Sequence, residues 1–461
     1  MTVYPRKMLL VAGAAILAAT PVAAQQRSYD ESLSLQLAPD QTENALEPDA
    51  VRVVSHPVVQ GIDTPAPSDP LVQQWSMADA RGLLDAIEAI GSEGLDPDDY
   101  QPDVLRLGIV SGPSPALDQL ASRLFGWLVE DLRDGRTPMS ARLQWHVADP
   151  DADLMPTGKV LADALASHDI AGTLAKLDPT YPDYAALKAQ LAATPAEDTD
   201  TTKLIRANMD RWRWLPRDLG GQYLIVNVPE MRLRLMVNGK MIRTYRTIVG
   251  KPGRTATPQI AETVEGVIFN PTWTVPQSII VGEGLGRKVL NNPSWARSMG
   301  YVATRDANGR LTIVQQPGPK NALGLVKLDM PNPYSIFLHD TPNRTLFERD
   351  NRALSHGCIR VDRALEMAMT VAILGGGATK DEAVAISDSG EYTRVPLANK
   401  IPIYVTYFTM GRDADGNMTT FKDLYGRDAP VLDALDQPRS ANRPRQTSEH
   451  VSDYVDDLQV G

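Results

Sequence analysis

Cysteine is nearly absent from this chain of 461 residues, in which Cys358 is the only one. A lone cysteine cannot form an internal disulfide, the usual use of cysteines in exported proteins. It is therefore a buried small apolar residue, a chance occurrence or a reactive thiol. An excess of positive charge is also lacking, since 46 Lys and Arg stand against 57 Asp and Glu, for a net charge of -11. This balance is unlike that of nucleic-acid binders and gives no reason for adhesion to anionic lipid.

Long apolar runs are missing as well, apart from one near the start of the chain. Residues 8–19 form an apolar run after Arg6 and Lys7, and Ala23-Ala24 offers a small-residue cleavage site. The run is too short to span a bilayer comfortably, because that takes roughly 20 residues. We therefore expect a cleaved export signal at residues 1–24, a periplasmic mature protein and no membrane span after signal removal. An uncleaved anchor is the alternative.

The next part of the chain changes from a linker pattern to a helical one. Residues 25–73 are polar and rich in proline, which favours a flexible linker. In residues 74–196 apolar side chains recur at three- and four-residue steps, the period of an amphipathic helix. The clearest helical stretches are 77–87, 117–132, 160–174 and 184–191. We expect a helical domain that holds no cluster of catalytic residue types.

After a further helix at residues 203–214, the apolar period changes to two, which predicts strands. The expected strands are 223–228, 231–236, 243–249, 266–269, 311–315, 335–338 and 403–408. Asn238-Gly239 is a dipeptide that closes a hairpin between the second and third of them.

The pattern therefore predicts an α+β protein. An N-terminal helical scaffold domain is followed by a mostly antiparallel β domain over residues 203–425. Within that domain, residues 281–316 are expected to form a helical capping flap. The polar residues 426–461 are expected to be a disordered tail.

The residue types that could take part in catalysis are concentrated between positions 336 and 361. His339-Asp340 precedes a polar loop that leads to Ser355-His356-Gly357-Cys358. A cysteine attacks as its thiolate, and a nearby imidazole can take the proton. A glycine before the nucleophile lets backbone N–H groups approach a developing oxyanion. These residues suggest Cys358 as nucleophile and His339 as its base.

Other interpretations of these residues are open at this point. Cys358, His339 and His356 could ligate zinc, although a catalytic zinc usually has three ligands with further supporting groups. The thiol could also be buried and inert. The remaining histidines are interpreted as chance surface residues; they are His56, His146, His168 and His450.

A histidine, a loop of about sixteen residues and then Ser-His-Gly-Cys-Ile-Arg resemble the signature of the YkuD-type L,D-transpeptidases. Further segments resemble the large YcbB-like branch of that family. They are Trp212-Arg213-Trp214-Leu215-Pro216, Val249-Gly250-Lys251-Pro252, Asn270-Pro271-Thr272-Trp273-Thr274-Val275-Pro276, Gln316-Pro317-Gly318-Pro319-Lys320-Asn321 and His339-Asp340-Thr341-Pro342. Together the segments cover most of residues 75–425, which makes the β domain the expected catalytic domain.

The resemblance implies a role for each residue of the core motif. Cys358 matches the nucleophile and His339 the general base. Asp340 matches the residue that orients the base through its backbone carbonyl. His356 and Gly357 lie in the loop whose N–H groups, with that of Cys358, form the oxyanion hole in the family.

Five further residues are expected at the substrate. Arg360 could bind a substrate carboxylate bidentately or brace the loop. Trp273 could line the acceptor path or belong to the core. Phe337 stands where this branch often has tyrosine, so a hydroxyl contact is lost. Ser355 and Asn321 complete the predicted set.

The activity implied by the resemblance is peptidoglycan cross-linking without metal or cofactor. Cys358 would attack a tetrapeptide stem at meso-diaminopimelate and release D-Ala. The side-chain amine of a second diaminopimelate would then accept the acyl group in a 3→3 cross-link. Hydrolysis, D-amino-acid exchange and protein anchoring are alternatives from the same site, and a non-catalytic wall scaffold is a further one. The implied partners are peptidoglycan stem peptides and other cell-wall enzymes.

Overall fold

The computed structural model describes residues 72–147 and 155–440. The predicted signal at residues 1–24, the linker up to residue 71 and the end of the chain from residue 441 lie outside the described residues.

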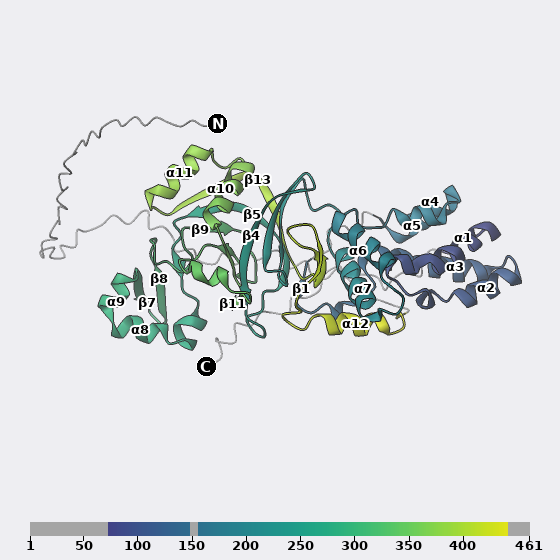
Figure 1. The fold of residues 1–461 in the computed structure, drawn as a ribbon, viewed down its shortest axis with the longest axis horizontal. Coiled ribbons are helices and arrows are strands. Elements are labelled where there is room, and N and C mark those ends of the chain that lie inside the picture. Colours follow the sequence, from purple (N-terminus) through teal and green to yellow (C-terminus); the bar gives the residue numbers. More distant parts are fainter. Residues whose placement is uncertain (1–71, 148–154, 441–461) are drawn as a thin grey trace, which may run out of the picture. The chain divides into compact units, whose positions relative to one another are not determined.

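The helical domain is built from six helices, of which the first five share one apolar core and the sixth packs Tyr184 and Leu187 into a second core with residues of the β domain. They are α1 (Met77–Ala89), α2 (Pro102–Ser111), α3 (Pro115–Asp134), α4 (Thr157–Ser167), α5 (Ile170–Ala175) and α6 (Pro182–Ala193) (Figure 1). Serine caps begin α1 and α3, where Ser76 and Ser114 accept a backbone N–H of the first turn. The long helix α3 buries Leu124 and Phe125 in the core of the first five helices. One expected helix is divided into α4 and α5 because His168 adopts a left-handed conformation, with φ of 52°.

An aromatic cluster joins the helices to the β domain. Helix α7 (Thr199–Arg213) carries Trp212, whose ring stacks on Phe408 with centroids 4.3 Å apart. The ring of Tyr181, just before α6, has its centroid 5.0 Å from that of Trp212. Because the three rings are buried, they fix α6 and α7 against the β domain.

The β domain is a mostly antiparallel sheet that closes on itself. Its strands follow the order β1-β5-β13-β2-β3-β4-β12-β10-β9, and β9 pairs again with β5. The bounds are β1 (Trp145–His146), β2 (Gln222–Asn227), β3 (Arg232–Val237), β4 (Lys240–Gly250), β5 (Gln259–Phe269), β9 (Val326–Asp329), β10 (Leu338–His339), β11 (Ala353–Ser355), which pairs with β4, β12 (Ile359–Val361) and β13 (Thr393–Thr406). Closure satisfies the backbone groups that an open edge would expose.

The predicted hairpin is present and the strand lengths differ from expectation. Val237 pairs with Lys240 across Asn238-Gly239, and both turn residues have positive φ, as the tight primed turn requires. Strands β5 and β13 extend well beyond the predicted 266–269 and 403–408 because exposed polar residues interrupt their apolar alternation. The strand predicted at 335–338 is shorter and begins only at Leu338.

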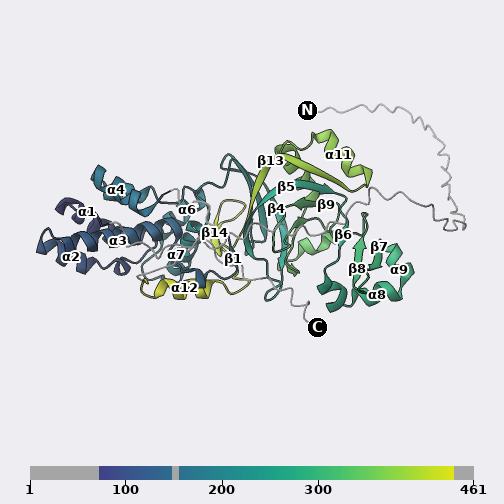
Figure 2. The same ribbon diagram turned by 180° about the vertical axis from the view of Figure 1, so that it is seen from behind.

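The capping flap has its own small core and is not wholly helical. It comprises β6 (Trp273–Thr274), a π-helical turn (Ser278–Gly282), α8 (Leu285–Asn291), α9 (Pro293–Ser298), β7 (Tyr301–Arg305) and β8 (Leu311–Gln315). Figures 1 and 2 show α8, α9, β7 and β8 gathered into one group. Val275, Ile280 and Ile313 form the core of this group. The flap predicted as helical over residues 281–316 therefore also contains strands of a three-stranded sheet.

The remaining elements follow the active-site segment. Helices α10 (Ala364–Leu374) and α11 (Lys380–Ser389) pack near the sheet, and β14 (Met410–Arg412) pairs with β15 (Met418–Thr420). No helix within the described ranges 72–147 and 155–440 combines the length and the apolar character that a bilayer crossing needs.

The prediction of a disordered tail from residue 426 is wrong for its first part. Helix α12 (Asp428–Asp436) buries Val431 and Leu435, which lie four residues apart on one face. Beyond it, the Arg439 guanidinium lies 2.8 Å from the Asp131 carboxylate of α3, and both side chains are buried. The high polar content of this segment hid the short apolar stripe of α12.

Candidate active site

Strand register brings the predicted nucleophile and base to one face of the sheet. Strands β10 and β12 pair in parallel, with Leu338 opposite Ile359 and His339 opposite Arg360. Because side chains alternate along a strand, the fully buried Leu338 and Ile359 belong to the core. His339 and Arg360 therefore point to the opposite face, beside Cys358, which directly precedes β12.

The Cys358 thiol is held at the start of β10. Its Sγ donates a hydrogen bond to the Ser335 carbonyl over 3.4 Å. The Phe337 N–H also points to the sulfur and lowers the pKa of Cys358. His339 lies two residues after Phe337, so the register of β10 and β12 puts the thiol and the imidazole on the same face of the sheet. Ser335 has a positive φ of 54°, which directs its carbonyl to the thiol.

The imidazole of His339 is buried and held in one tautomer. Its Nδ1 lies 2.6 Å from the Asp340 carbonyl oxygen. A carbonyl can only accept, so Nδ1 donates and Nε2 is left with a free lone pair. The Asp340 carboxylate meanwhile accepts the Leu325 N–H at 2.9 Å and lies 2.8 Å from Arg344. Asp340 thus orients the base through its backbone, while its side chain fixes the surrounding loop.

The Cys358 thiol and the His339 imidazole are both neutral at neutral pH. Burial, with the charges of Arg360 and Lys327, lowers the pKa of His339 to about 3. Burial raises the pKa of the Cys358 thiol, outweighing the Phe337 N–H and the two cations. No hydrogen bond joins the two side chains within the described part of the chain.

The raised pKa of Cys358 predicts slow alkylation at neutral pH. We expect the rate with iodoacetamide to rise by about tenfold per pH unit from pH ~6 to ~9, because only the thiolate reacts. A thiol of depressed pKa would instead reach a plateau within this interval. Mass spectrometry of the labelled protein measures the rate, and since Cys358 is the only cysteine, no other thiol interferes. A plateau below pH ~7 would contradict the neutral resting pair.

The loop before Cys358 presents two backbone donors. Gly357 has a φ of 116°, which a side chain would disfavour. Its N–H donates to Ser355 Oγ at 3.1 Å, and Ser355 Oγ donates to the Cys358 carbonyl at 2.6 Å. The N–H groups of His356 and Cys358 have no acceptor among the described residues. Of the three predicted oxyanion donors, two are available and that of Gly357 is occupied.

The His356 side chain connects this loop to the flap. Its Nε2 lies 2.6 Å from Glu283 Oε1, and both side chains are about half exposed. Glu283 directly follows the π-helical turn of the flap. One side-chain contact thus links the flap to the loop that carries Cys358.

A row of cations faces the reactive pair. Lys327 of β9 lies opposite His339 in the antiparallel register, and its Nζ lies 3.9 Å from the centre of the Phe337 ring. Arg360 lies on the other side of His339, and its Nε is buried without an acceptor. The guanidinium makes no hydrogen bond or ion pair within the described ranges. The two roles predicted for Arg360, carboxylate binding and bracing of the loop, stay predictions. Lys327 was absent from the predicted set.

The other two predicted substrate residues have structural contacts. The Asn321 amide donates to the carbonyls of Pro271 and Gln316, and its Oδ1 accepts the Leu323 N–H. Asn321 is therefore fully used in holding the segment between the flap and β9. Trp273 is half-buried and packs against the core of the flap.

Two of the histidines interpreted as chance surface residues have specific partners. His146 stacks on Tyr334 with ring centroids 4.6 Å apart, directly before Ser335. His168 Nδ1 lies 3.0 Å from the buried Asp79 carboxylate. The interpretation is corrected for these two, while His56 and His450 lie outside the described residues.

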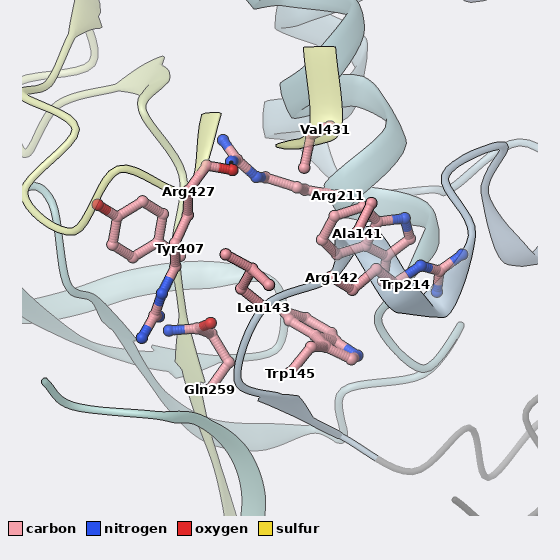
Figure 3. A pocket seen from close by; sticks show the side chains of 10 residues that line it. All are labelled: Ala141, Arg142, Leu143, Trp145, Arg211, Trp214, Gln259, Tyr407, Arg427 and Val431. Atoms are coloured by element: carbon pink, nitrogen blue, oxygen red, sulfur yellow. Dashed lines mark hydrogen bonds between the residues drawn. The ribbon is translucent and has the colours of Figure 1, made fainter. Parts of the chain in front are cut away.

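A small pocket lies apart from the predicted site residues (Figure 3). It is lined by Ala141, Arg142, Leu143, Trp145, Arg211, Trp214, Gln259, Tyr407, Arg427 and Val431. The Arg427 guanidinium lies 4.8 Å from the ring centres of both Tyr407 and Tyr425.

No group of three or more potential metal ligands occurs within residues 72–147 and 155–440.

The site thus combines a thiol, a neutral imidazole oriented by a backbone carbonyl, and backbone N–H groups without an acceptor among the described residues. Residues 221–395 match the L,D-transpeptidase catalytic domain of the YkuD family, and residues 73–191 match the scaffold domain. The chain therefore contains a YkuD catalytic domain preceded by a scaffold domain. This architecture is consistent with the YcbB-like branch.

The chain is also similar to a curated relative and to solved structures. A Haemophilus influenzae protein named "Putative L,D-transpeptidase" is 30% identical over 252 residues, which cover 51% of this chain and 50% of that protein. The chain thus spans about half the length of this relative. A Mycobacterium smegmatis L,D-transpeptidase is 14% identical with a TM-score of 0.21, over 40% of this chain and 58% of that one. An L,D-transpeptidase in complex with imipenem is 15% identical with a TM-score of 0.20, over 40% and 59%. These scores are too low for argument by superposition, so the assignment depends on the family matches.

Proposed function

We propose that this protein is a periplasmic peptidoglycan L,D-transpeptidase that forms 3→3 cross-links through a Cys358 acyl-enzyme. The observation that carries the proposal is the Cys358 and His339 pair, held on one sheet face within a YkuD catalytic domain. The Nδ1–Asp340 hydrogen bond leaves Nε2 of His339 ready to take the thiol proton.

The acylation step begins when substrate draws the thiol away from the Ser335 carbonyl. Cys358 Sγ gives its proton to His339 Nε2 and bonds to the carbonyl carbon of meso-diaminopimelate. The oxyanion that forms accepts hydrogen bonds from the free N–H groups of Cys358 and His356. The C–N bond to D-Ala then breaks, and the proton on His339 passes to the leaving amine.

The second half of the cycle reverses these roles. The side-chain amine of another diaminopimelate attacks the thioester, and His339 takes its proton. The C–S bond breaks and the thiol is restored as the new amide forms. The cleaved peptide bond supplies the driving force, so no ATP is needed.

The flap favours an amine over water as acceptor. Its Glu283 meets His356 directly beside the nucleophile, so the closed flap restricts solvent at the thioester. An acyl-enzyme open to solvent would be hydrolysed, which is carboxypeptidase activity.

Arg360 is the group that binds a carboxylate of the donor stem. Replacing it with glutamine should raise KM by about tenfold, the loss of one charge-assisted contact, with a smaller change in kcat. Steady-state kinetics with purified tetrapeptide measures both. Glu366→Gln is a matched control, because this exposed carboxylate faces Arg363 away from the thiol. An unchanged KM would favour the bracing role.

Incubation of the mature protein with purified disaccharide-tetrapeptides tests the function. We expect mass spectrometry to find tetrapeptide–tripeptide dimers and free D-Ala. Tripeptide monomers alone would mean hydrolysis, D-amino-acid incorporation would mean exchange, and attachment to an added lysine-bearing protein would mean anchoring. No product under any condition would favour a non-catalytic wall scaffold. Activity lost in EDTA and restored by zinc would favour the metal interpretation.

A further inference from the structure

A buried threonine joins two glycines on either side of the nucleophile loop. Thr257, two residues before β5, is fully buried. Its Oγ1 accepts the Gly250 N–H at 2.9 Å and donates to the Gly357 carbonyl at 2.7 Å. The hydroxyl is therefore satisfied in both directions, and it fixes the peptide that immediately precedes Cys358.

The orientation of this peptide decides where an oxyanion donor points. In a planar trans peptide the C=O and the N–H point in opposite directions. Because Thr257 holds the Gly357 carbonyl, the Cys358 N–H must point away from Thr257, where it has no acceptor among the described residues. Gly357 could otherwise rotate easily, since glycine has little preference among backbone conformations.

We propose that Thr257 is a positioning residue that aims the Cys358 N–H at the oxyanion of the acylation step. The inference rests on the proposed acyl-transfer function and adds a residue that lies 101 positions before the nucleophile. Thr257 does not touch the substrate; it acts through the peptide between Gly357 and Cys358.

The surroundings of Thr257 make the clamp rigid. Tyr425 Oη accepts the Thr257 N–H at 3.3 Å and donates to the Gly250 carbonyl at 2.7 Å. Gly250 has no room for a side chain, because an added Cβ would lie 1.9 Å from the Thr255 carbonyl oxygen. Arg427 of the pocket in Figure 3 donates to the Thr257 carbonyl at 3.3 Å. The pocket residue therefore supports the backbone that presents the threonine hydroxyl.

Thr257→Val tests the clamp, because valine keeps the shape and removes the hydroxyl. We expect kcat for dimer formation to fall about 10- to 100-fold with KM within about threefold, since removing one oxyanion donor outright costs about 10²- to 10³-fold. Thr257→Ser keeps the hydroxyl and should retain kcat within about threefold of the wild type. If the valine variant does not fold, Thr257→Ala removes the same hydroxyl without added branching.

Alkylation of Cys358 by iodoacetamide separates an oxyanion effect from a disturbed thiol. This displacement forms no oxyanion, so the valine and wild-type proteins should react at the same rate. A valine variant with wild-type kcat, or one whose alkylation falls as much as its acylation, would overturn the clamp. A serine variant as impaired as valine would overturn it as well. An inactive wild type with normal alkylation would instead refute the proposed function.

Discussion

Replacing Cys358 with serine is expected to abolish cross-linking, with dimer formation at least about 10³-fold below the wild type. The serine hydroxyl is a much weaker acid than the thiol. The His339 imidazole, with a pKa of about 3, is too weak a base to remove the hydroxyl proton. The thiol works despite its own raised pKa because thiolates remain strong nucleophiles. Muropeptide analysis measures the loss, and the intact mass after incubation with a carbapenem checks for the acyl-enzyme.

The fold of this variant should be preserved. Cys358 is only half-buried, and a serine hydroxyl can donate to the Ser335 carbonyl as the thiol does. Circular dichroism and the thermal midpoint should therefore match the wild type. A matched control is Ser298→Ala in the flap, where an exposed hydroxyl bonds only to Trp295 of its own helix. Cross-linking by the serine variant at the wild-type rate would refute the covalent mechanism.

Local sequence patterns were sufficient to predict most helices of the scaffold domain and the hairpin, and they drew attention to the segment that holds His339 and Cys358. Asn238-Gly239 determines its turn through two backbone angles, which depend on those residues alone. His339 and Cys358 lie within 20 residues of each other, and the pairing of β10 with β12 needed only a short loop between them. In this segment the same short stretch of sequence indicated both the reactive residues and the local structure.

Contacts that depend on sheet closure could not be predicted from local sequence patterns. Lys327 reaches His339 because β9 pairs with both β10 and β5, and Thr257 reaches Gly357 across about 100 residues. An isolated lysine in a strand or a threonine before one gives no local sign of these contacts. The occupied N–H of Gly357 was equally hidden, because it depends on how the Ser355 side chain turns.

The electrostatic state of the site also required the structure. A histidine beside a cysteine is compatible with an ion pair or with two neutral groups. Burial of His339 and the nearby charge of Arg360 lower the pKa of the imidazole, which favours two neutral groups over an ion pair. Arg360 was predicted as a substrate ligand. It lowers the pKa of the imidazole because the strand register places it opposite His339.

Replacing His339 with alanine is expected to lower the rate of acylation by about 10²- to 10⁴-fold, the range for loss of a general base. The pKa of Cys358 is raised, so without His339 the thiol must lose its proton to solvent before attack. The residual rate should therefore rise with pH up to at least pH ~9, whereas the wild type should vary less around neutrality.

Acylation by a carbapenem, followed by intact mass over time, measures this effect separately from acceptor chemistry. The variant leaves the Asp340 carbonyl without its buried donor, which costs about 1–3 kcal/mol of folding stability, so assays belong well below the thermal midpoint. His168→Ala is the matched control, because its imidazole is largely exposed and pairs with Asp79 in the helical domain. The control should acylate at the wild-type rate. If His339→Ala did so too, with an unchanged pH profile, proton transfer would have to be assigned to another group, and His356 is the only other histidine in the nucleophile loop.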